Sequence, residues 1–240
     1  MIKVFTYPNR IIFNKAANKL TQVIERKLKA RQRILLLLSG GSCLNLYQKL
    51  SENIQNSLLP WHLVTFAQVD ERFNPSDDNE VNANAIEKTG PSLVLRKKNI
   101  PHFTISQTGT LKQSADQYNH TIIKLFHDCQ FRASVMGVGD DGHTAGLLPG
   151  YAKKWNNEKF AVGYENNGKF KYRISISPYA IKQLDYVLIL LAGETKRKML
   201  ERFIKSSKNE SLNEFPAAVL KNIKEIDVLT PDLSKLVRQG

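Results

Sequence analysis

Short apolar runs alternate with longer amphipathic stretches along this 240-residue chain. The run Ile34–Leu38 is continuously apolar and ends in a glycine-containing turn, a pattern typical of a strand that is buried on both faces. The stretch 14–30 instead places Leu20, Val23, Ile24 and Leu28 at helical spacing, which predicts an amphipathic helix.

The rest of the pattern repeats this alternation. The predicted strands cover 34–38, 63–69, 133–136, 173–177, 186–191 and 226–229, and the predicted helices cover 14–30, 44–50, 81–87, 113–127 and 194–203. Strands separated by helices indicate βαβ units. No Pro/Gly/Ser-rich linker divides the chain, so we expect one α/β domain over residues 1–240. Its sheet should be mainly parallel and Rossmann-like, with helices on both faces.

Composition excludes several classes of protein. The longest dense apolar run is far too short for a membrane helix, and the N-terminus has no signal-peptide pattern. We therefore expect a cytoplasmic protein with no membrane partner. The chain has two cysteines, Cys43 and Cys129, which form no disulfide framework.

The net charge of +13 allows either nucleic-acid binding or a site for an anionic metabolite. The basic residues are spread along the chain, and the cluster 25–33 falls on the polar face of the first predicted helix. No nucleic-acid-binding motif is present. We expect a small anionic substrate and no nucleic acid.

The segment 137–144 carries the strongest chemical signal. The predicted strand 133–136 ends in a glycine loop that contains Asp140, Asp141 and His143. Glycine permits close approach of the backbone to a ligand, and a neighbouring carboxylate can fix the tautomer and basicity of a histidine. A purely structural histidine and a divalent-metal site are the alternatives. No second histidine lies at ligand spacing and no G-x-S-x-G elbow exists, so acid–base chemistry without a metal is favoured.

Three other segments follow predicted strands and carry groups that suit an anion. Ser39-Gly40-Gly41-Ser42 precedes a helix, where free amides favour an anion; the alternative is a tight turn with Ser42 as N-cap. Asp70-Glu71-Arg72 could place a carboxylate in the site and an arginine that binds phosphate through two N–H groups; the alternative is a surface ion pair. Lys196, in the segment 193–196, is expected in the first turn of a helix, an unfavourable place for a cation unless an anion binds there.

Parallel strands end at one edge of a sheet, so these loops are expected to converge despite their separation in sequence. Arg173, at the start of a predicted strand, is a further candidate cation. Cys43 lies at a helix start, where the pKa of a thiol can fall, so a cysteine nucleophile is a weaker alternative.

Taken together, these motifs resemble those of the 6-phosphogluconolactonase family, within the wider glucosamine-6-phosphate isomerase/deaminase superfamily. The matching segments, in family order, are Gly40-Gly41-Ser42, Asp70-Glu71-Arg72 with Pro75 and Asn82, Gly137–Pro149, Arg173–Ser177, Gly193–Lys196 and Pro216–Leu220. The departures are Cys43-Leu44 for Thr-Pro, Asn74 and Val81 for Val and Ser, Gly146-Leu147-Leu148 for Ser-Leu-Phe, and an unusual ending over 226–240.

The resemblance implies hydrolysis of 6-phospho-D-glucono-1,5-lactone, with no cofactor or metal. We expect a monomer or weak homo-oligomer. It implies that His143 is the base and that Asp141 or Asp70 assists it. The implied substrate- and phosphate-binding residues are Gly40, Gly41, Ser42, Arg72, Gly139, Arg173 and Lys196.

Two other functions are alternatives to the lactonase. Members of the deaminase branch share Asp-Gly-His but continue with A-F-N-E-P, whose glutamate serves ring opening; residues 145–149 contain no glutamate. A sugar-phosphate sensor would usually carry a helix-turn-helix. Only a predicted strand and one helix precede residue 34, and His143 is present, so the lactonase is favoured.

Overall fold

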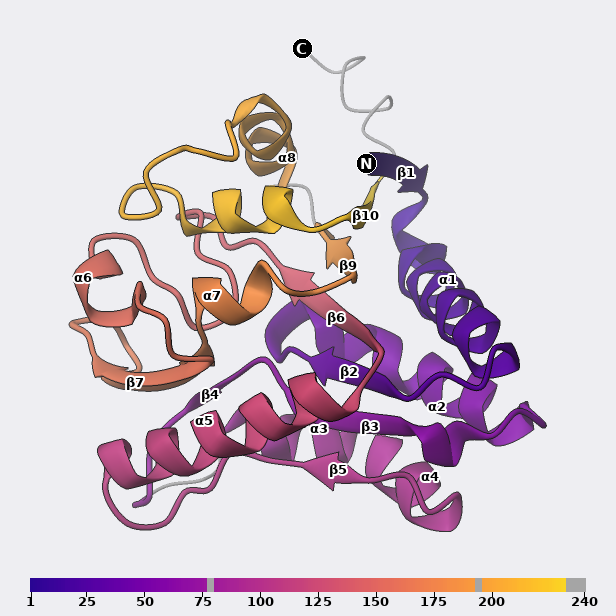
Figure 1. The fold of residues 1–240 in the computed structure, drawn as a ribbon. Helices are drawn as coiled ribbons and strands as arrows, with labels where there is room; N and C mark the ends of the chain where they lie inside the picture. Colours follow the sequence, from indigo (N-terminus) through magenta and orange to yellow (C-terminus); the bar gives the residue numbers. More distant parts are fainter. Residues whose placement is uncertain (77–79, 193–195, 232–240) are drawn as a thin grey trace.

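The computed structural model describes residues 1–76, 80–192 and 196–231, and its main sheet is parallel throughout. The strand order is β1-β10-β9-β6-β2-β3-β5. In chain order these strands are β1 (Ile2–Tyr7), β2 (Ile34–Leu38), β3 (Val64–Gln68), β5 (His102–Phe103), β6 (Phe131–Gly137), β9 (Tyr186–Leu190) and β10 (Glu225–Pro231). The predicted parallel α/β fold is confirmed, as Figure 1 shows.

A second, three-stranded antiparallel sheet was not predicted. It consists of β4 (Asp70–Arg72), β8 (Tyr172–Ile176) and β7 (Ala161–Glu165), in the order β4-β8-β7. Val69 joins the two sheets: its N–H donates to the carbonyl of Leu38 in the main sheet (2.9 Å), and its carbonyl accepts from the N–H of Ile176 (2.9 Å). The chain therefore passes from β3 into β4 almost without a break.

Helices cover both faces of the main sheet (Figure 1). They are α1 (Asn9–Lys29), α2 (Tyr47–Asn56), α3 (Asn82–Lys88), α4 (Pro91–Lys97), α5 (Leu111–Asp128), α6 (Ala152–Trp155), α7 (Pro178–Ile181) and α8 (Lys196–Lys205), with 3₁₀ turns η1 (Gly41–Leu46), η2 (Trp61–Leu63) and η3 (Pro216–Asn222). The helix predicted over 44–50 is therefore divided between η1 and α2. Side chains from α1 to α4 pack on one face, and those from α5, α7, α8 and the second sheet pack on the other.

The strand β2 shows how the sequence determines this layering. All five of its side chains are buried, because Ile34, Leu36 and Leu38 join the core under α1 and α2 while Leu35 and Leu37 join the core on the opposite face. The apolar stripe predicted along the first helix is likewise buried in α1. Burial on both faces fixes the register of β2 and so the position of the loop that follows it.

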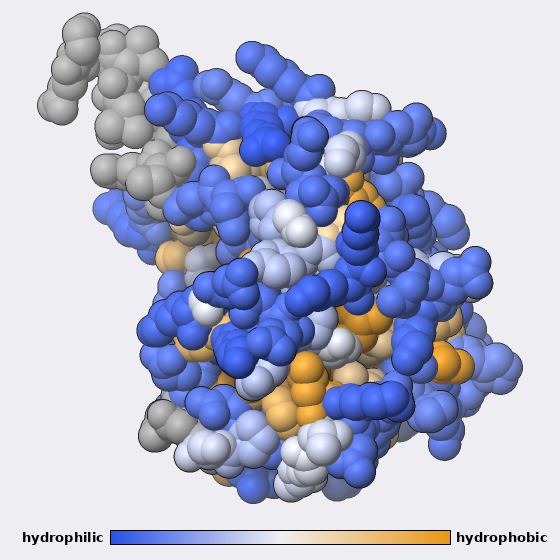
Figure 2. Space-filling view, turned by 90° about the vertical axis from the view of Figure 1, so that its left-hand side faces the viewer, coloured by the Kyte–Doolittle hydropathy of each residue, from blue (hydrophilic) through white to orange (hydrophobic). Residues whose placement is uncertain are grey.

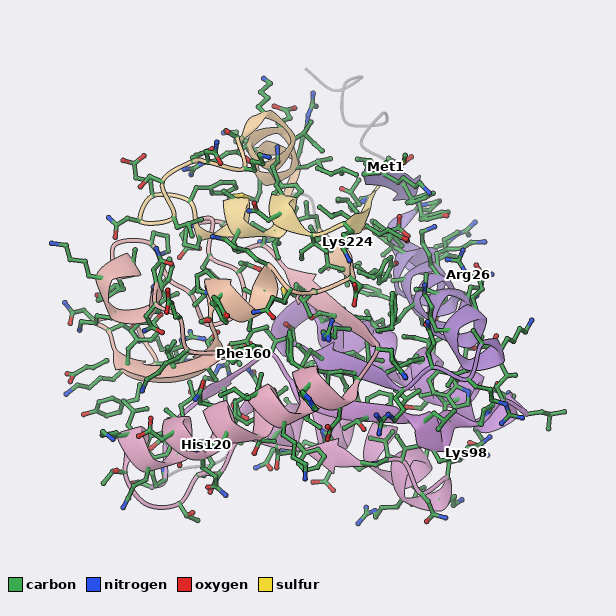
Figure 3. The ribbon with its side chains drawn as sticks, in the orientation of Figure 1. Met1, Arg26, Lys98, His120, Phe160 and Lys224 are labelled. Carbon is green, nitrogen blue, oxygen red and sulfur yellow. The ribbon has the colours of Figure 1, made fainter. Side chains whose placement is uncertain are left out.

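One face of the molecule is predominantly polar. The face in Figure 2 is mostly hydrophilic, with smaller patches of hydrophobic residues between the charged ones. At the outer edge of the main sheet, the amino group of Met1 donates to the carbonyl of Lys224 (2.6 Å), and both residues are labelled in Figure 3. Within the described ranges, no helix is both long and apolar enough to cross a bilayer.

Candidate active site

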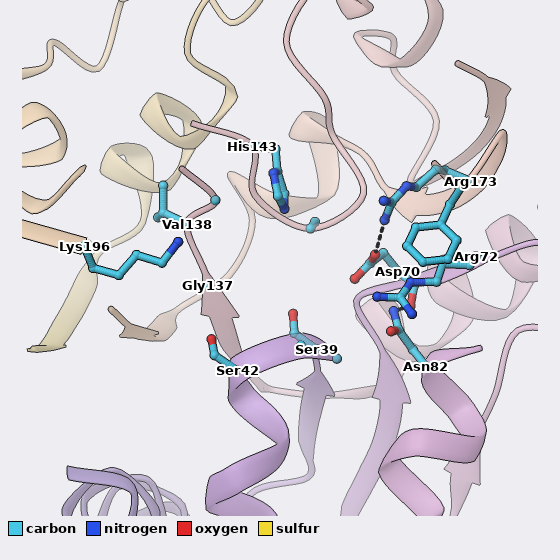
Figure 4. A pocket seen from close by; sticks show the side chains of 15 residues that line it. Ser39, Ser42, Asp70, Arg72, Asn82, Gly137, Val138, His143, Arg173 and Lys196 are labelled. Carbon is cyan, nitrogen blue, oxygen red and sulfur yellow. Dashed lines mark hydrogen bonds and ion pairs between the residues drawn. The ribbon is translucent and has the colours of Figure 1, made fainter. Parts of the chain in front are cut away.

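A cavity of about 410 Å³ opens where the carboxyl ends of the parallel strands meet the second sheet. Figure 4 shows Lys196 on one side of this pocket, Asp70, Arg72 and Arg173 on the other, and His143 between them. Nine of the ten predicted site residues line it, and they are Gly40, Gly41, Ser42, Asp70, Arg72, Gly139, His143, Arg173 and Lys196. The tenth, Asp141, contacts His143. The predicted meeting of distant loops is thus present in the structure.

The glycine loop after β6 presents the imidazole of His143 to the pocket. Two hydrogen bonds close the loop on itself. The N–H of Gly139 donates to the carbonyl of His143 (2.8 Å), and the N–H of Gly142 donates to the carbonyl of Gly139 (3.0 Å). A Cβ atom at Gly139 would overlap the imidazole ring, so only glycine allows the ring to lie across the loop at this point.

Asp141 orients the imidazole. Its Oδ1 lies 2.6 Å from Nδ1 of His143 and also accepts the backbone N–H of that residue (3.0 Å). Burial raises the pKa of Asp141, but the hydrogen bonds from His143 outweigh this effect and lower it to about 2. An ionised carboxylate only accepts hydrogen bonds, so Nδ1 is the donor in this contact, and the tautomer that the contact favours for the neutral imidazole has its lone pair on Nε2.

The loop after β2 brings its backbone to the pocket floor. Gly40 lies so close to Asn82 that a Cβ atom would overlap the side-chain amide, and Gly41 adopts a positive φ of 62°. Asn82 in turn donates from Nδ2 to the carbonyl of Asp70 (3.1 Å). The alternative prediction, with Ser42 as N-cap, is wrong. The N-cap of η1 is Gly40, which has no side chain that could accept a capping hydrogen bond.

The opposite wall carries two arginines and one carboxylate. Arg173 Nη1 lies 3.6 Å from Asp70 Oδ2, and both side chains are almost fully buried. Burial raises the pKa of Asp70, while the charges of Arg173, His143 and Arg72 act against this rise. Arg72 donates to the carbonyl of Glu80 (2.6 Å). The Nε atoms of both arginines are buried and have no hydrogen-bond partner in the part of the chain that the structure describes.

Glu71 holds this wall in place and does not face the pocket. It is fully buried and accepts hydrogen bonds from the side chain of Gln68 (2.8 Å), from the backbone of Arg72 (2.8 Å) and from the first two amides of α3. Burial raises the pKa of Glu71, and these hydrogen bonds oppose the rise. The glutamate therefore ties β4 to α3, and with them Asp70 and Arg72 to Asn82.

Lys196 approaches from the main-sheet side, as the first residue of α8. Its Nζ lies 2.6 Å from Oδ1 of Asp140, and the lysine side chain is largely buried while that of Asp140 is exposed. Asp140 therefore lies at the rim and holds the lysine. The remainder of the predicted segment, 193–195, lies outside the described residues.

The structure argues against one alternative for the chemistry, a cysteine nucleophile. Burial raises the pKa of the Cys43 thiol to about 12, so the predicted lowering of this pKa at a helix start is wrong and the thiol is no nucleophile at neutral pH. Over residues 1–76, 80–192 and 196–231, no three His, Cys, Asp or Glu side chains are grouped as metal ligands.

Six residues that line the pocket were not among the predicted site residues: Ser39, Asn82, Gly137, Val138, Ala145 and Phe170. Most of them flank predicted residues in the same loops, so the loop motifs themselves point to them. Phe170 is different, because it lies in the polar connection between β7 and β8, and no pattern in the sequence links that connection to the pocket.

Comparison with known proteins places these features in a wider group. The sequence model of the family described as "Glucosamine-6-phosphate isomerases/6-phosphogluconolactonase" matches residues 9–229. A 6-phosphogluconolactonase of Xylella fastidiosa is 30% identical over 192 residues, which cover 76% of this chain and 77% of that protein. A 6-phosphogluconolactonase of Thermotoga maritima is 25% identical over 194 residues, which cover 79% and 83%.

Solved structures share the fold. The crystal structure of the 6-phosphogluconolactonase from Thermotoga maritima has a TM-score of 0.78 at 21% identity and covers 97% of this chain and 99% of its own. A monomeric glucosamine-6-phosphate deaminase has a TM-score of 0.71 at 18% identity and covers 99% of both chains. The fold alone thus accommodates both named activities.

Proposed function

Because the chain belongs to the glucosamine-6-phosphate isomerase/6-phosphogluconolactonase family, we propose that it hydrolyses 6-phospho-D-glucono-1,5-lactone to 6-phosphogluconate, a step of the oxidative pentose phosphate pathway, within a single domain. The observation that carries the proposal is the His143–Asp141 pair facing a pocket rich in cationic groups. A base beside an anion site suits an ester substrate that bears a remote phosphate.

His143 acts as the general base in this proposal. Its Nε2 takes a proton from a water molecule as the water oxygen attacks the lactone carbonyl carbon. When the bond from that carbon to the ring oxygen breaks, the same proton passes to the ring oxygen, which becomes a hydroxyl group. Asp141 stabilises the imidazolium that exists between the two transfers, through the 2.6 Å contact with Nδ1.

The remaining pocket groups bind the substrate. Backbone amides of the two glycine loops other than those of Gly139 and Gly142, which donate within their own loop, stabilise the oxyanion that develops on the carbonyl oxygen. The phosphate is held by the amides of Gly41 and Ser42 together with the cations Arg72, Arg173 and Lys196. Asp70 balances the charge of Arg173 and limits the positive charge left over when the pocket is empty.

A glucosamine-6-phosphate deaminase is the second candidate, favoured by the shared fold. In that branch the segment after Asp-Gly-His supplies a glutamate for ring opening. Here the same segment is Ala145-Gly146-Leu147-Leu148-Pro149, in which Leu147 is buried and no carboxylate exists. The lactonase needs no such group, because the lactone ring itself is the reactive ester.

The test generates the lactone in situ from glucose-6-phosphate and follows its hydrolysis above the spontaneous rate. We expect acceleration by the pure protein, retained after exhaustive chelation, and no release of ammonia from glucosamine-6-phosphate. Absence of acceleration would refute the lactonase assignment. A His143→Ala variant with wild-type activity would refute the assigned base and leave the reaction standing.

A further inference from the structure

Phe170 lies on the pocket wall against both arginines, and the proposed reaction gives it no role. The centroid of its ring is 4.0 Å from Cζ of Arg72 and 5.4 Å from Cζ of Arg173. The side chain is half-buried and lines the pocket. One aromatic ring thus contacts the two guanidinium groups nearest to Asp70.

The two arginines need such a partner. Arg72 and Arg173 are directly opposite one another in the antiparallel β4–β8 pair, an arrangement that is unfavourable for like charges. Burial lowers the pKa of Arg72, and the positive charge of Arg173 lowers it further. Asp70 contacts Arg173, and the carboxylate of Glu71 accepts hydrogen bonds from Gln68 and from backbone amides. The charges of Asp70, Glu71 and Glu80 oppose the lowering of the Arg72 pKa, but among the described residues no carboxylate forms an ion pair with Arg72 itself.

The position of the ring is fixed by the turn that carries it. Asn166, whose side chain is buried, donates from Nδ2 to the carbonyls of Phe170 (2.8 Å) and Lys171 (3.0 Å), and its Oδ1 accepts the N–H of Gly168 (2.8 Å). At the tip, Lys169 pairs with Glu80 (2.9 Å). The connection is thus tied to itself and to the segment that receives a hydrogen bond from Arg72.

We propose that Phe170 is a positioning residue that holds the guanidinium groups of Arg72 and Arg173 ready for one phosphate group, and thereby gives the site its preference for phosphorylated over non-phosphorylated lactones. The inference rests on the proposed function for the identity of the substrate. The binding of phosphate by the two arginines can be measured whether or not the protein hydrolyses a lactone.

The physical reason is the charge distribution of the ring. The face of an aromatic ring attracts a cation, and the attraction grows when water is excluded, so one ring offsets part of the repulsion between two guanidinium groups. It also restricts their rotamers before the ligand arrives, which lowers the ordering cost of binding. An aliphatic side chain of similar size fills the same space without either effect.

The test compares Phe170→Leu, Phe170→Tyr and wild type in calorimetric titrations with inorganic phosphate and with 6-phosphogluconate. We expect Phe170→Leu to weaken both by about tenfold and Phe170→Tyr to bind like wild type. Phe160→Leu is the matched control, since Phe160 also lies in the second-sheet region (Figure 3) but contacts the rings of Phe126 and Tyr179. Unchanged binding by Phe170→Leu, or equal weakening by the control, would overturn the proposal.

A second measurement leaves the shape of the side chain almost unchanged. Mono-, di- and trifluorinated phenylalanines placed at position 170 reduce the negative potential of the ring face stepwise. We expect the dissociation constant for inorganic phosphate to rise at each step, and a series without a trend would overturn the proposal. This arm also decides the question if Phe170→Leu fails to fold.

Kinetics then test the link to specificity. In Phe170→Leu, kcat/KM for 6-phosphogluconolactone should fall about tenfold, mainly through KM, while kcat/KM for the non-phosphorylated gluconolactone stays unchanged. An equal loss on both lactones would show a general structural role and overturn the proposal. If wild type hydrolyses neither lactone but the phosphate titrations respond as expected, the proposed function fails and the assignment of Phe170 stands.

Discussion

The two walls of the pocket are built in opposite ways. The main sheet contributes loops of small residues, in which Gly40 and Gly139 let backbone and imidazole approach closely. The second sheet contributes charged side chains, in which Arg72, Arg173 and Asp70 are held on short antiparallel strands. The first wall is therefore sensitive to added volume, and the second is sensitive to removed charge. In the proposed mechanism the first wall supplies the acid–base group, while recognition of the substrate charge is shared between the arginines of the second wall and the Gly41 and Ser42 amides and Lys196 on the main-sheet side.

The largest expected effect comes from removing the base on the glycine-loop wall. His143→Ala should lower kcat by about 10²–10⁴-fold because general base catalysis is lost, with a much smaller change in KM. Steady-state hydrolysis of the in situ lactone, corrected for the spontaneous rate, measures this. A fall in affinity for 6-phosphogluconate as large as the fall in kcat would contradict the division between the walls.

Removing a cation from the second-sheet wall should act on binding first. Arg173→Ala should lower kcat/KM for the phosphorylated lactone by about 10–100-fold, as expected for lost hydrogen bonds to a charged group, and spare the non-phosphorylated lactone. For Arg173→Lys we expect a kcat/KM between those of wild type and Arg173→Ala, because lysine keeps the positive charge but cannot bind the phosphate through two parallel N–H groups.

Arg132→Ala is the matched control for that loss. Arg132 also lies near an aspartate, Asp185 (3.7 Å), and over the ring of Phe126, but it belongs to the amino-terminal end of β6, far along the strand from the glycine loop. Equal losses in the control and in Arg173→Ala would show that the effect is not specific to the pocket wall.

The Asp141–His143 contact should appear in the dependence of stability on pH. The pKa of Asp141 is about 2 in the folded protein against an ordinary value of 3.8. The ionised carboxylate therefore contributes to the free energy of unfolding above about pH 4, and this contribution is lost as the pH falls toward 2. Wild type should therefore lose more free energy of unfolding over this interval than Asp141→Asn does. Denaturant titrations at pH 5, 4, 3 and 2 measure the difference, and parallel curves for the two proteins would contradict it.

The smallest effect is expected at Cys43. Its thiol is buried and its pKa is raised to about 12, so the thiolate is absent at neutral pH. Cys43→Ala should leave kcat/KM unchanged and destabilise the fold by about 1 kcal/mol through the lost side-chain volume. Inactivation of the native enzyme by iodoacetamide that Cys43→Ala abolishes would show that the thiol takes part after all.

The same contrast explains what the sequence predicted. The strand Ile34–Leu38 was predicted residue for residue, because burial on both faces leaves an unbroken apolar run. The glycine loop after β6 was recognisable because close packing against His143 requires glycine. Such local constraints are visible in a single segment of sequence.

The second sheet could not be predicted in the same way. β4 has three residues and continues directly from β3, so residues 70–72 were predicted as the loop that follows the strand 63–69, whereas the structure has a second strand there. The opposition of Arg72 and Arg173 depends on pairing between segments far apart in the chain. The choice between Asp70 and Asp141 as the partner of His143 likewise depended on distances, and the structure shows Asp141 in contact with Nδ1.

A crystal structure of the protein with 6-phosphogluconate tests the division between the two walls most directly. The account predicts that the phosphate lies within hydrogen-bond distance of the guanidinium group of Arg173, and that the C1 carboxylate, which comes from the lactone carbonyl, lies beside Nε2 of His143. A product bound in the reverse orientation, with its phosphate against His143 and its carboxylate between Arg72 and Arg173, would contradict it.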